Sequence, residues 1–209
     1  MTPVGAVALG LVLALLDLRI YGFDVLPDVV GWLVAVRGLS RLTTLDGRFG
    51  PALRWALLTA VLSLADLVRA QVTTTTDTMT ATSDAAPAGL HGWLVTAYGL
   101  AGVVVVVLLS LALRDRARIV GDLSPAGRFT TFACLHAGLG VVLLAGGVLA
   151  LLSTDDGSIE ATGGLAALTL VVVVAALAVQ VFFVLALRGV RERPWLQEPA
   201  PPVQERLPG

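Results

Sequence analysis

Long apolar segments alternate with short polar links along almost the whole chain. Spanning the hydrocarbon core of a bilayer takes about 20 mostly apolar residues. The six expected spans cover residues 3–20, 27–41, 51–69, 93–113, 129–152 and 165–187. Valine runs such as 103–107 favour strands in water, but a segment in lipid must satisfy its own backbone groups and therefore becomes helical. The pattern predicts an all-α integral membrane protein: one bundle of six transmembrane helices over residues 1–193.

The arginines between these segments predict the orientation of the bundle. They cluster in or beside the second link, around the fourth link and after the last span. The third link, 70–92, is threonine-rich, and the fifth, 153–164, carries acids but no arginine. Because cytoplasmic links hold the excess of positive charge, we expect both termini in the cytoplasm and the 70–92 loop outside. The proline-rich tail 194–209 is expected to be a disordered cytoplasmic segment.

Composition strengthens the membrane interpretation. Hydrophobic residues make up 56% of the chain and charged residues 14%, whereas soluble domains carry about 25% charged residues. The mean hydropathy is +0.88. A net charge of −1 argues against nucleic acid as a partner. The single cysteine, Cys134, allows no intramolecular disulfide and no cysteine-based zinc site, and we expect it to be a small buried apolar residue.

Two further expectations concern location. No cationic residue precedes the first apolar run and no Ala-x-Ala site follows it, so we expect this run to be retained rather than cleaved as a signal peptide. All cationic residues are arginine, in a chain rich in alanine, valine and glycine. That bias suggests a GC-rich bacterial genome, and the expected location is the bacterial cytoplasmic membrane.

The segment 17–32 differs from the rest of the chain, because it places charges, aromatic residues and a proline between two apolar runs. Pro27 suits a first helical position, and Asp28 in that first turn complements the positive end of the helix dipole. The residues that define the segment are Asp17-Leu-Arg-Ile20, Phe23-Asp-Val-Leu-Pro-Asp28 and Gly31-Trp32. They resemble a segment that recurs between the first two spans of uncharacterised small membrane proteins of Gram-positive, actinobacterial-type bacteria. The resemblance implies a multi-pass membrane protein and no particular activity.

Charged residues near the predicted outer end form the first candidate site. Thr59, Ser63 and Asp66 follow the i, i+4, i+7 pattern of one helix face. This stripe should face the protein interior, because a carboxylate toward lipid costs about 2.5 to 3.5 kcal/mol. The functional hypothesis is an outward-facing site for a cation or cationic solute. Its candidate residues are Asp17, Arg19, Asp24, Asp28, Asp66 and Arg69.

A structural interpretation of the same cluster is favoured. Asp66 can pair with Arg69 one turn further along its helix. Asp17 can pair with Arg19 or with Arg69. Asp24 can cap the second helix. In this interpretation the charges hold the outer end of the bundle together and bind nothing else.

His136 and Gln180 form a second candidate group. If the fifth and sixth spans make a hairpin about Ser158, the two positions fall level, so an interhelical hydrogen bond is expected. Polar pairs of this kind tie membrane helices together by roughly 0.6 to 2 kcal/mol each. The functional alternative makes His136 a proton-relay or pH-sensing group. The hydrogen bond is the favoured interpretation, and no set of metal ligands accompanies the histidine.

No phosphate-binding loop, zinc-protease motif or nucleophile elbow is present, and no cofactor is implied. Two functional hypotheses follow. The first is a non-enzymatic structural or accessory membrane module, with the lipid bilayer as its surroundings and a second copy or another membrane protein as its partner. The second is a small transporter or channel that uses the outer carboxylates to attract a cation. The first is favoured, because the polar residues at depth are few and can pair with one another.

Overall fold

The structure is a computed structural model. It describes residues 1–15, 19–20, 23–24, 28–74, 90–152 and 163–196. Within these ranges the description covers the backbone only at 15, 19–20, 23–24, 65–74, 90–93, 95, 143, 147–152 and 163–170. Most of the predicted 70–92 loop and of the tail 194–209 therefore lies outside the described residues.

Helices make up nearly all the regular structure. The α-helices are α1 (Pro3–Leu15), α2 (Asp28–Leu45), α3 (Gly50–Thr74), α4 (Leu90–Ile119), α5 (Leu123–Leu152) and α6 (Gly163–Val190). The short 3-10 helices are η1 (Gly47–Phe49) and η3 (Pro194–Leu196). Two strands of two residues each, β1 (Arg19–Ile20) and β2 (Phe23–Asp24), pair antiparallel between α1 and α2. The all-α prediction is confirmed, and each predicted span overlaps one helix. The first predicted span, 3–20, is too long, because α1 ends at Leu15 and Arg19–Ile20 form β1.

Three of the helices are long and apolar enough to cross a membrane, among the residues that the structure describes. The qualifying segments are Thr96–Ile119, Leu123–Gly146 and Val171–Val190. The segment Pro3–Ala14 is apolar but shorter. α2 and α3 carry charges within their length, such as Arg37 and Arg54, which lowers their hydropathy. A chain with three membrane-compatible helices is thus established, whereas six spans remain a prediction.

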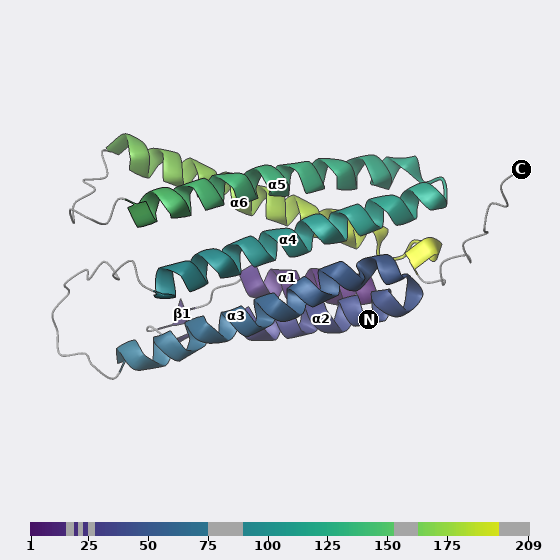
Figure 1. The fold of residues 1–209 in the computed structure, drawn as a ribbon. Helices are drawn as coiled ribbons and strands as arrows, with labels where there is room; N and C mark the ends of the chain where they lie inside the picture. The colour runs from purple at the N-terminus through teal and green to yellow at the C-terminus, as the bar shows by residue number, and fades with distance from the viewer. Residues whose placement is uncertain (16–18, 21–22, 25–27, 75–89, 153–162, 197–209) are drawn as a thin grey trace, which may run out of the picture.

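The helices lie side by side along one common direction (Figure 1). Each helix packs against the next in sequence, and α6 returns to α1. The turn from α4 to α5 is tight: Gly121 has a φ of 77°, in the left-handed region that favours glycine. The buried core draws on most helices, with Leu11, Leu39, Leu109 and Phe183 all less than 3% exposed.

α1 and α2 approach so closely that glycine is required at their contact. A Cβ atom added at Gly31 would collide with the backbone of Ala14 and would lie 2.8 Å from the carbonyl oxygen of Gly10. A Cβ atom at Gly38 would lie 2.7 Å from the carbonyl oxygen of Pro3. Small residues that let two backbones meet are typical of helix pairs in membranes, where packing replaces the hydrophobic effect. Gly31 of the 17–32 segment therefore has a packing role.

α5 and α6 present most of their apolar surface outward. Only 18% of the qualifying window of α5 and 17% of that of α6 is buried. Exposed side chains include Leu135, Val141 and Phe182, the last at 63%. In water such a surface would drive aggregation. Hydrocarbon can cover this surface without cost, so the exposed apolar side chains are compatible with a membrane location.

Cys134 corrects one expectation, because its side chain is exposed rather than buried. It follows Ala133 and precedes Leu135 on α5, whose outward surface is apolar. A thiol needs no protein cover when lipid can solvate it. The prediction of a buried cysteine assumed that an apolar residue must be covered by protein, which holds in water but not in a bilayer.

The position of Cys134 offers a test of membrane insertion. In membrane fragments open on both sides, a water-soluble maleimide should leave Cys134 unmodified, because such a reagent does not enter hydrocarbon. A Thr44→Cys substitution in a Cys134→Ala background should react within minutes, since Thr44 is exposed near the charged end of α2. Labelling is read by mass spectrometry. Equal labelling of the two thiols would mean that α5 does not lie in the bilayer.

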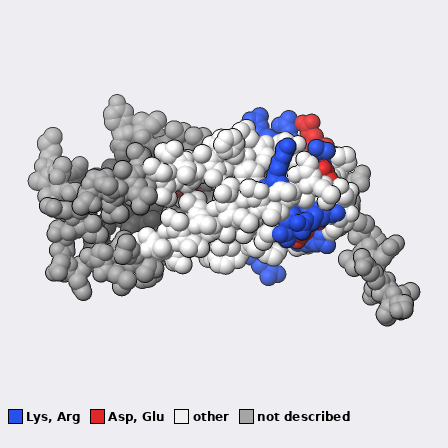
Figure 2. Space-filling model, turned by 90° about the horizontal axis from the view of Figure 1, so that it is seen from above, with Lys and Arg blue, Asp and Glu red and all other residues white. Residues whose placement is uncertain are grey.

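The start of α1 and the end of α6 lie at the same end of the bundle, because Met1 and Thr2 share a groove with Arg188 and Arg191. Among the described residues seen in Figure 2, arginine and acidic side chains gather toward one end. This end also holds Arg116, which contacts Asp46. The start of α1 and the end of α6 therefore share one end of the bundle, whereas the placement of both termini on one side of a membrane remains a prediction. That this side is the cytoplasm remains a prediction.

Candidate functional site

The first polar group joins α2 to α4. Asp28 and Trp32 lie one turn apart on α2, and both reach the phenol of Tyr98 on α4. The indole Nε1 of Trp32 donates to the Tyr98 hydroxyl at 3.1 Å, and that hydroxyl donates to Oδ2 of Asp28 at 2.7 Å. A hydrogen bond to a charged group contributes about 1.5–3 kcal/mol. We call these three residues the Tyr98 triad.

Of the six residues predicted as an outer cluster, Asp28 alone has a described side chain. Asp17 lies outside the described residues. Arg19 and Asp24 are opposite each other in the β1–β2 pair, and β2 lies beside α3, which carries Asp66 and Arg69. The side chains of Arg19, Asp24, Asp66 and Arg69 are outside the description. The backbone therefore brings the segments together, while the outer site itself remains a prediction.

The cap of the second helix by Asp24 stays a prediction. Asp24 lies in β2 opposite Arg19, and α2 is described from Asp28 onward. The Asp24 side chain and residues 25–27 lie outside the description. Asp28 occupies the first turn, as predicted.

The hydroxyls predicted to share a stripe with Asp66 face the interior of the bundle. Thr59 is 0% and Ser63 is 3% exposed. The Thr59 hydroxyl donates to the carbonyl of Trp55 at 2.8 Å, and the Ser63 hydroxyl to that of Ala60 at 2.8 Å. Both are satisfied within α3, so this part of the stripe is a packing surface.

The second polar group joins α5 to α6. His136 is 2% exposed, and its Nε2 lies 3.0 Å from Oε1 of Gln180, the contact expected from the hairpin register. Its Nδ1 lies 2.8 Å from the carbonyl oxygen of Phe132, to which it can only donate. With Nδ1 donating, a neutral ring can only accept at Nε2, which requires the Gln180 amide to turn its nitrogen rather than Oε1 toward the ring. The ring of Phe183 packs edge-on against the imidazole at 5.5 Å.

A cavity of about 230 Å³ lies between the two polar groups. It is bounded by residues of α1, α2, α4, α5 and α6, and we call it the central cavity. Most of its wall is aliphatic, and glycines of α4 leave the space open. The residues that give it its chemical character are Trp32, Tyr98, Gly99, Gly102, His136 and Gln180.

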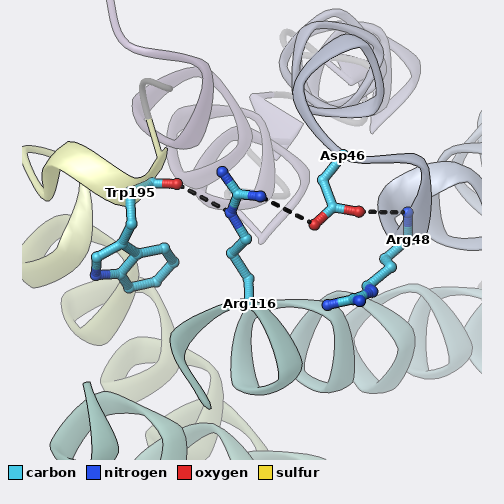
Figure 3. A network of polar contacts seen from close by, with 4 residues as sticks. All are labelled: Asp46, Arg48, Arg116 and Trp195. Atoms are coloured by element: carbon cyan, nitrogen blue, oxygen red, sulfur yellow. Dashed lines mark hydrogen bonds and ion pairs between the residues drawn. The ribbon is translucent and has the colours of Figure 1, made fainter. Parts of the chain in front are cut away.

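A third polar group, not singled out from the sequence, lies at the opposite end of α2 from the Tyr98 triad (Figure 3). Arg116 of α4 is 2% exposed; its Nη1 lies 3.4 Å from Oδ2 of Asp46, and its Nε donates to the carbonyl of Trp195 at 3.0 Å. Asp46 also accepts from the backbone N–H of Arg48 at 3.0 Å and so caps η1. One guanidinium thus joins the α2–α3 turn, α4 and the segment after α6.

Sequence signals for the missed residues exist. Leu109, Ala112, Leu113 and Arg116 recur at the spacing of one helix face, and all four are buried. An arginine that continues an apolar stripe is expected inside the protein with a carboxylate partner. Tyr98 lies within a predicted span, where a phenol needs a hydrogen-bond partner. In the sequence, Arg116 served only to predict the orientation of the bundle, and Tyr98 was considered only as part of a predicted span.

In the part of the chain that the structure describes, no three histidine, cysteine or acidic side chains are grouped as metal ligands. Comparison of the chain with protein-family models, with curated proteins and with solved structures finds no match. The functional argument therefore depends on the residues themselves.

Proposed function

We propose that this protein is a non-enzymatic helical module of the membrane, structural or accessory to a membrane-protein partner or a second copy of itself. The observation that supports this most directly is that the 17–32 segment holds neighbouring helices together. Of its most distinctive residues, Asp28 and Trp32 bond to Tyr98, and Gly31 allows α1 to touch α2. The residues of this segment whose side chains are described join α1, α2 and α4.

The other polar groups support the same proposal. His136 joins α5 to α6, and Arg116 of α4 joins the α2–α3 turn to the segment after α6. Among the described residues no buried polar side-chain atom lacks a hydrogen-bond partner. Catalytic groups commonly show strained or incomplete pairing until substrate binds, whereas a scaffold satisfies its polar groups internally. The bundle has the second arrangement.

The proposal predicts that Tyr98 is needed for stability. Tyr98→Phe should lower the free energy of unfolding of the detergent-purified protein by about 2 kcal/mol, because it leaves Asp28 and Trp32 without this hydroxyl. Phe182→Leu is the control, since this ring is 63% exposed and should change stability little. Equilibrium unfolding followed by circular dichroism measures both. Unchanged stability of Tyr98→Phe would contradict a fastening role for the Tyr98 triad.

A second candidate function, binding of a cationic solute for transport, is favoured by the central cavity. Trp32 and Tyr98 form part of its wall, and the Asp28 carboxylate lies behind the Tyr98 hydroxyl. Aromatic faces attract organic cations, and a nearby carboxylate strengthens that attraction. A cavity of about 230 Å³ holds a small molecule but not a drug-sized ligand.

The same unfolding assay distinguishes the two candidates when it is repeated with a panel of inorganic and quaternary ammonium cations. A solute that binds the folded state raises the melting temperature. Gly99→Leu should abolish that increase, because a Cβ atom at Gly99 meets no atom within 4 Å and the side chain can enter the cavity. A stabilising cation whose effect disappears in Gly99→Leu would favour transport. No stabilisation by any cation would favour the accessory module.

A further inference from the structure

A second hollow, lined by α5, α6 and the residue Arg193 beyond them, differs in chemistry from the central cavity. It has a volume of about 580 Å³, and we call it the α5–α6 pocket. Its walls are aromatic and aliphatic, with Phe129 and Phe132 from α5 and Phe182 from α6. Phe182 is 63% exposed and Leu135, also in the wall, is 47% exposed. The pocket therefore continues into the outward apolar surface of the two helices.

Positive charge lies at one end of this pocket. Arg128 on α5 and Arg193 after α6 both line it, together with the hydroxyl residues Ser124 and Thr131. Among the described residues Arg193 forms an ion pair with Asp122, its Nη1 lying 3.5 Å from Oδ2. That arginine is 51% exposed, and such a long, solvated pair contributes little and yields to a better anion. Within the described part of the chain, no carboxylate forms an ion pair with Arg128.

The depth of the arginines agrees with the level of phospholipid headgroups. α5 has 30 residues, which at 1.5 Å per residue gives about 45 Å, well beyond the hydrocarbon core of about 30 Å. At least one of its ends therefore extends past the core, and the end with Arg128 is the charged one, since Arg193 lines the same pocket and pairs with Asp122. Arg128 lies less than two turns from the start of α5, and Arg193 follows the end of α6. Long arginine side chains can also extend toward the interface.

We propose that the α5–α6 pocket binds an anionic phospholipid. The phosphodiester lies between the guanidinium groups of Arg128 and Arg193, which match phosphate oxygens in pairs. One acyl chain follows the apolar wall past Phe132 and Leu135. A pocket that combines basic residues with apolar walls between membrane helices fits this ligand better than a free anion, which would leave the walls unused. This inference rests on the proposed membrane function.

The test is the thermal stability of the full-length protein in detergent with added lipid. Phosphatidylglycerol should raise the melting temperature by several degrees, and phosphatidylcholine with the same acyl chains should raise it markedly less. The difference should disappear in the double variant Arg128→Gln with Arg193→Gln. It should persist in Arg41→Gln, an exposed arginine of α2 that lies outside this pocket.

A second variant keeps both charges and removes the space. Gly189 lines the pocket, and a Cβ atom there meets no atom within 4 Å, so Gly189→Leu should fold and fill the pocket. It should abolish the phosphatidylglycerol effect, whereas Gly138→Leu on α5, equally free of neighbours and outside the pocket, should not. Retention of the effect in Gly189→Leu, or equal effects of the two lipids, would overturn the proposal.

The last comparison repeats the thermal-stability measurement with inorganic phosphate and with glycerol 3-phosphate in place of the lipid. They should not reproduce the effect of the lipid. An equal effect would identify a soluble-anion site and contradict the lipid assignment. Protection of Cys134 from the water-soluble reagent together with no lipid effect would refute the lipid site alone, whereas modification of Cys134 in membranes would refute the membrane proposal itself.

Discussion

Gly31→Leu is expected to separate α1 from α2 and to prevent stable folding of the bundle. Even a Cβ atom at Gly31 would overlap the backbone of Ala14 and lie 2.8 Å from the Gly10 carbonyl oxygen. Backbone atoms cannot rotate away as side-chain ends can, so one helix must shift. Overpacking a tight core usually costs about 1–3 kcal/mol. Gly31→Ala should therefore cost about 3 kcal/mol, and Gly31→Leu considerably more.

The measurement is the yield of monodisperse protein and its free energy of unfolding in detergent. Gly138→Ala and Gly138→Leu are matched controls, because a Cβ atom at that position of α5 meets nothing within 4 Å. The alanine control should be slightly more stable than the wild type, since alanine favours helices over glycine by up to about 1 kcal/mol. If Gly31→Ala behaves like Gly138→Ala, α1 and α2 are not in backbone contact and the fold as described is wrong at this point.

The helices could be predicted because length and hydropathy alone require them in lipid. Their ends are less determined: α4 and α5 extend past the predicted spans 93–113 and 129–152, the former to Ile119 and the latter back to Leu123. Arg116 and Arg118 lie within this extension of α4. Hydropathy stops a predicted span at the first arginines, whereas the helix continues because its backbone remains hydrogen-bonded outside the bilayer core.

The contact between His136 and Gln180 could be anticipated because a hairpin fixes which residues of two adjacent helices lie level. The Tyr98 triad could not, since Asp28 and Tyr98 are 70 residues apart and their contact depends on how α2 and α4 pack. The close contact of α1 with α2 was missed for a similar reason. Gly10 and Gly31 are two of 22 glycines, and their spacing alone does not distinguish them from glycines that touch nothing.

Packing between helices also decides which charged residues are buried, and this could not be predicted from the sequence. Apart from Arg19 and Arg69, the arginines were assigned to the predicted cytoplasmic side as a group, which is sufficient for orientation but treats each as solvated. Arg116 is instead buried, while Arg118, two residues on, is exposed. Helical geometry places positions two apart on different faces. One of these two arginines therefore has a structural role that the other lacks, and the pair provides its own control.

Arg116→Met is expected to be the most destabilising substitution at the charged end. It removes the guanidinium that contacts Asp46 and the donor to the Trp195 carbonyl, with Asp46 only 9% exposed. Removing one partner of a buried ion pair costs about 3–5 kcal/mol, because the other charge stays buried. Arg118→Gln should change the free energy of unfolding by less than about 0.5 kcal/mol.

A double-mutant cycle separates the ion pair from the packing of the arginine stem. Asp46→Asn keeps the size of the side chain and can still accept from the Arg48 N–H to cap η1. If Arg116 and Asp46 depend on each other, the combined variant should be more stable than the sum of the single losses predicts, by at least about 1 kcal/mol. Strict additivity would mean that Arg116 acts through Trp195 and its packing alone. Coupling would show that this buried pair joins α4 to the α2–α3 turn. That result would support the accessory-module proposal, in which the buried polar groups hold the helices together.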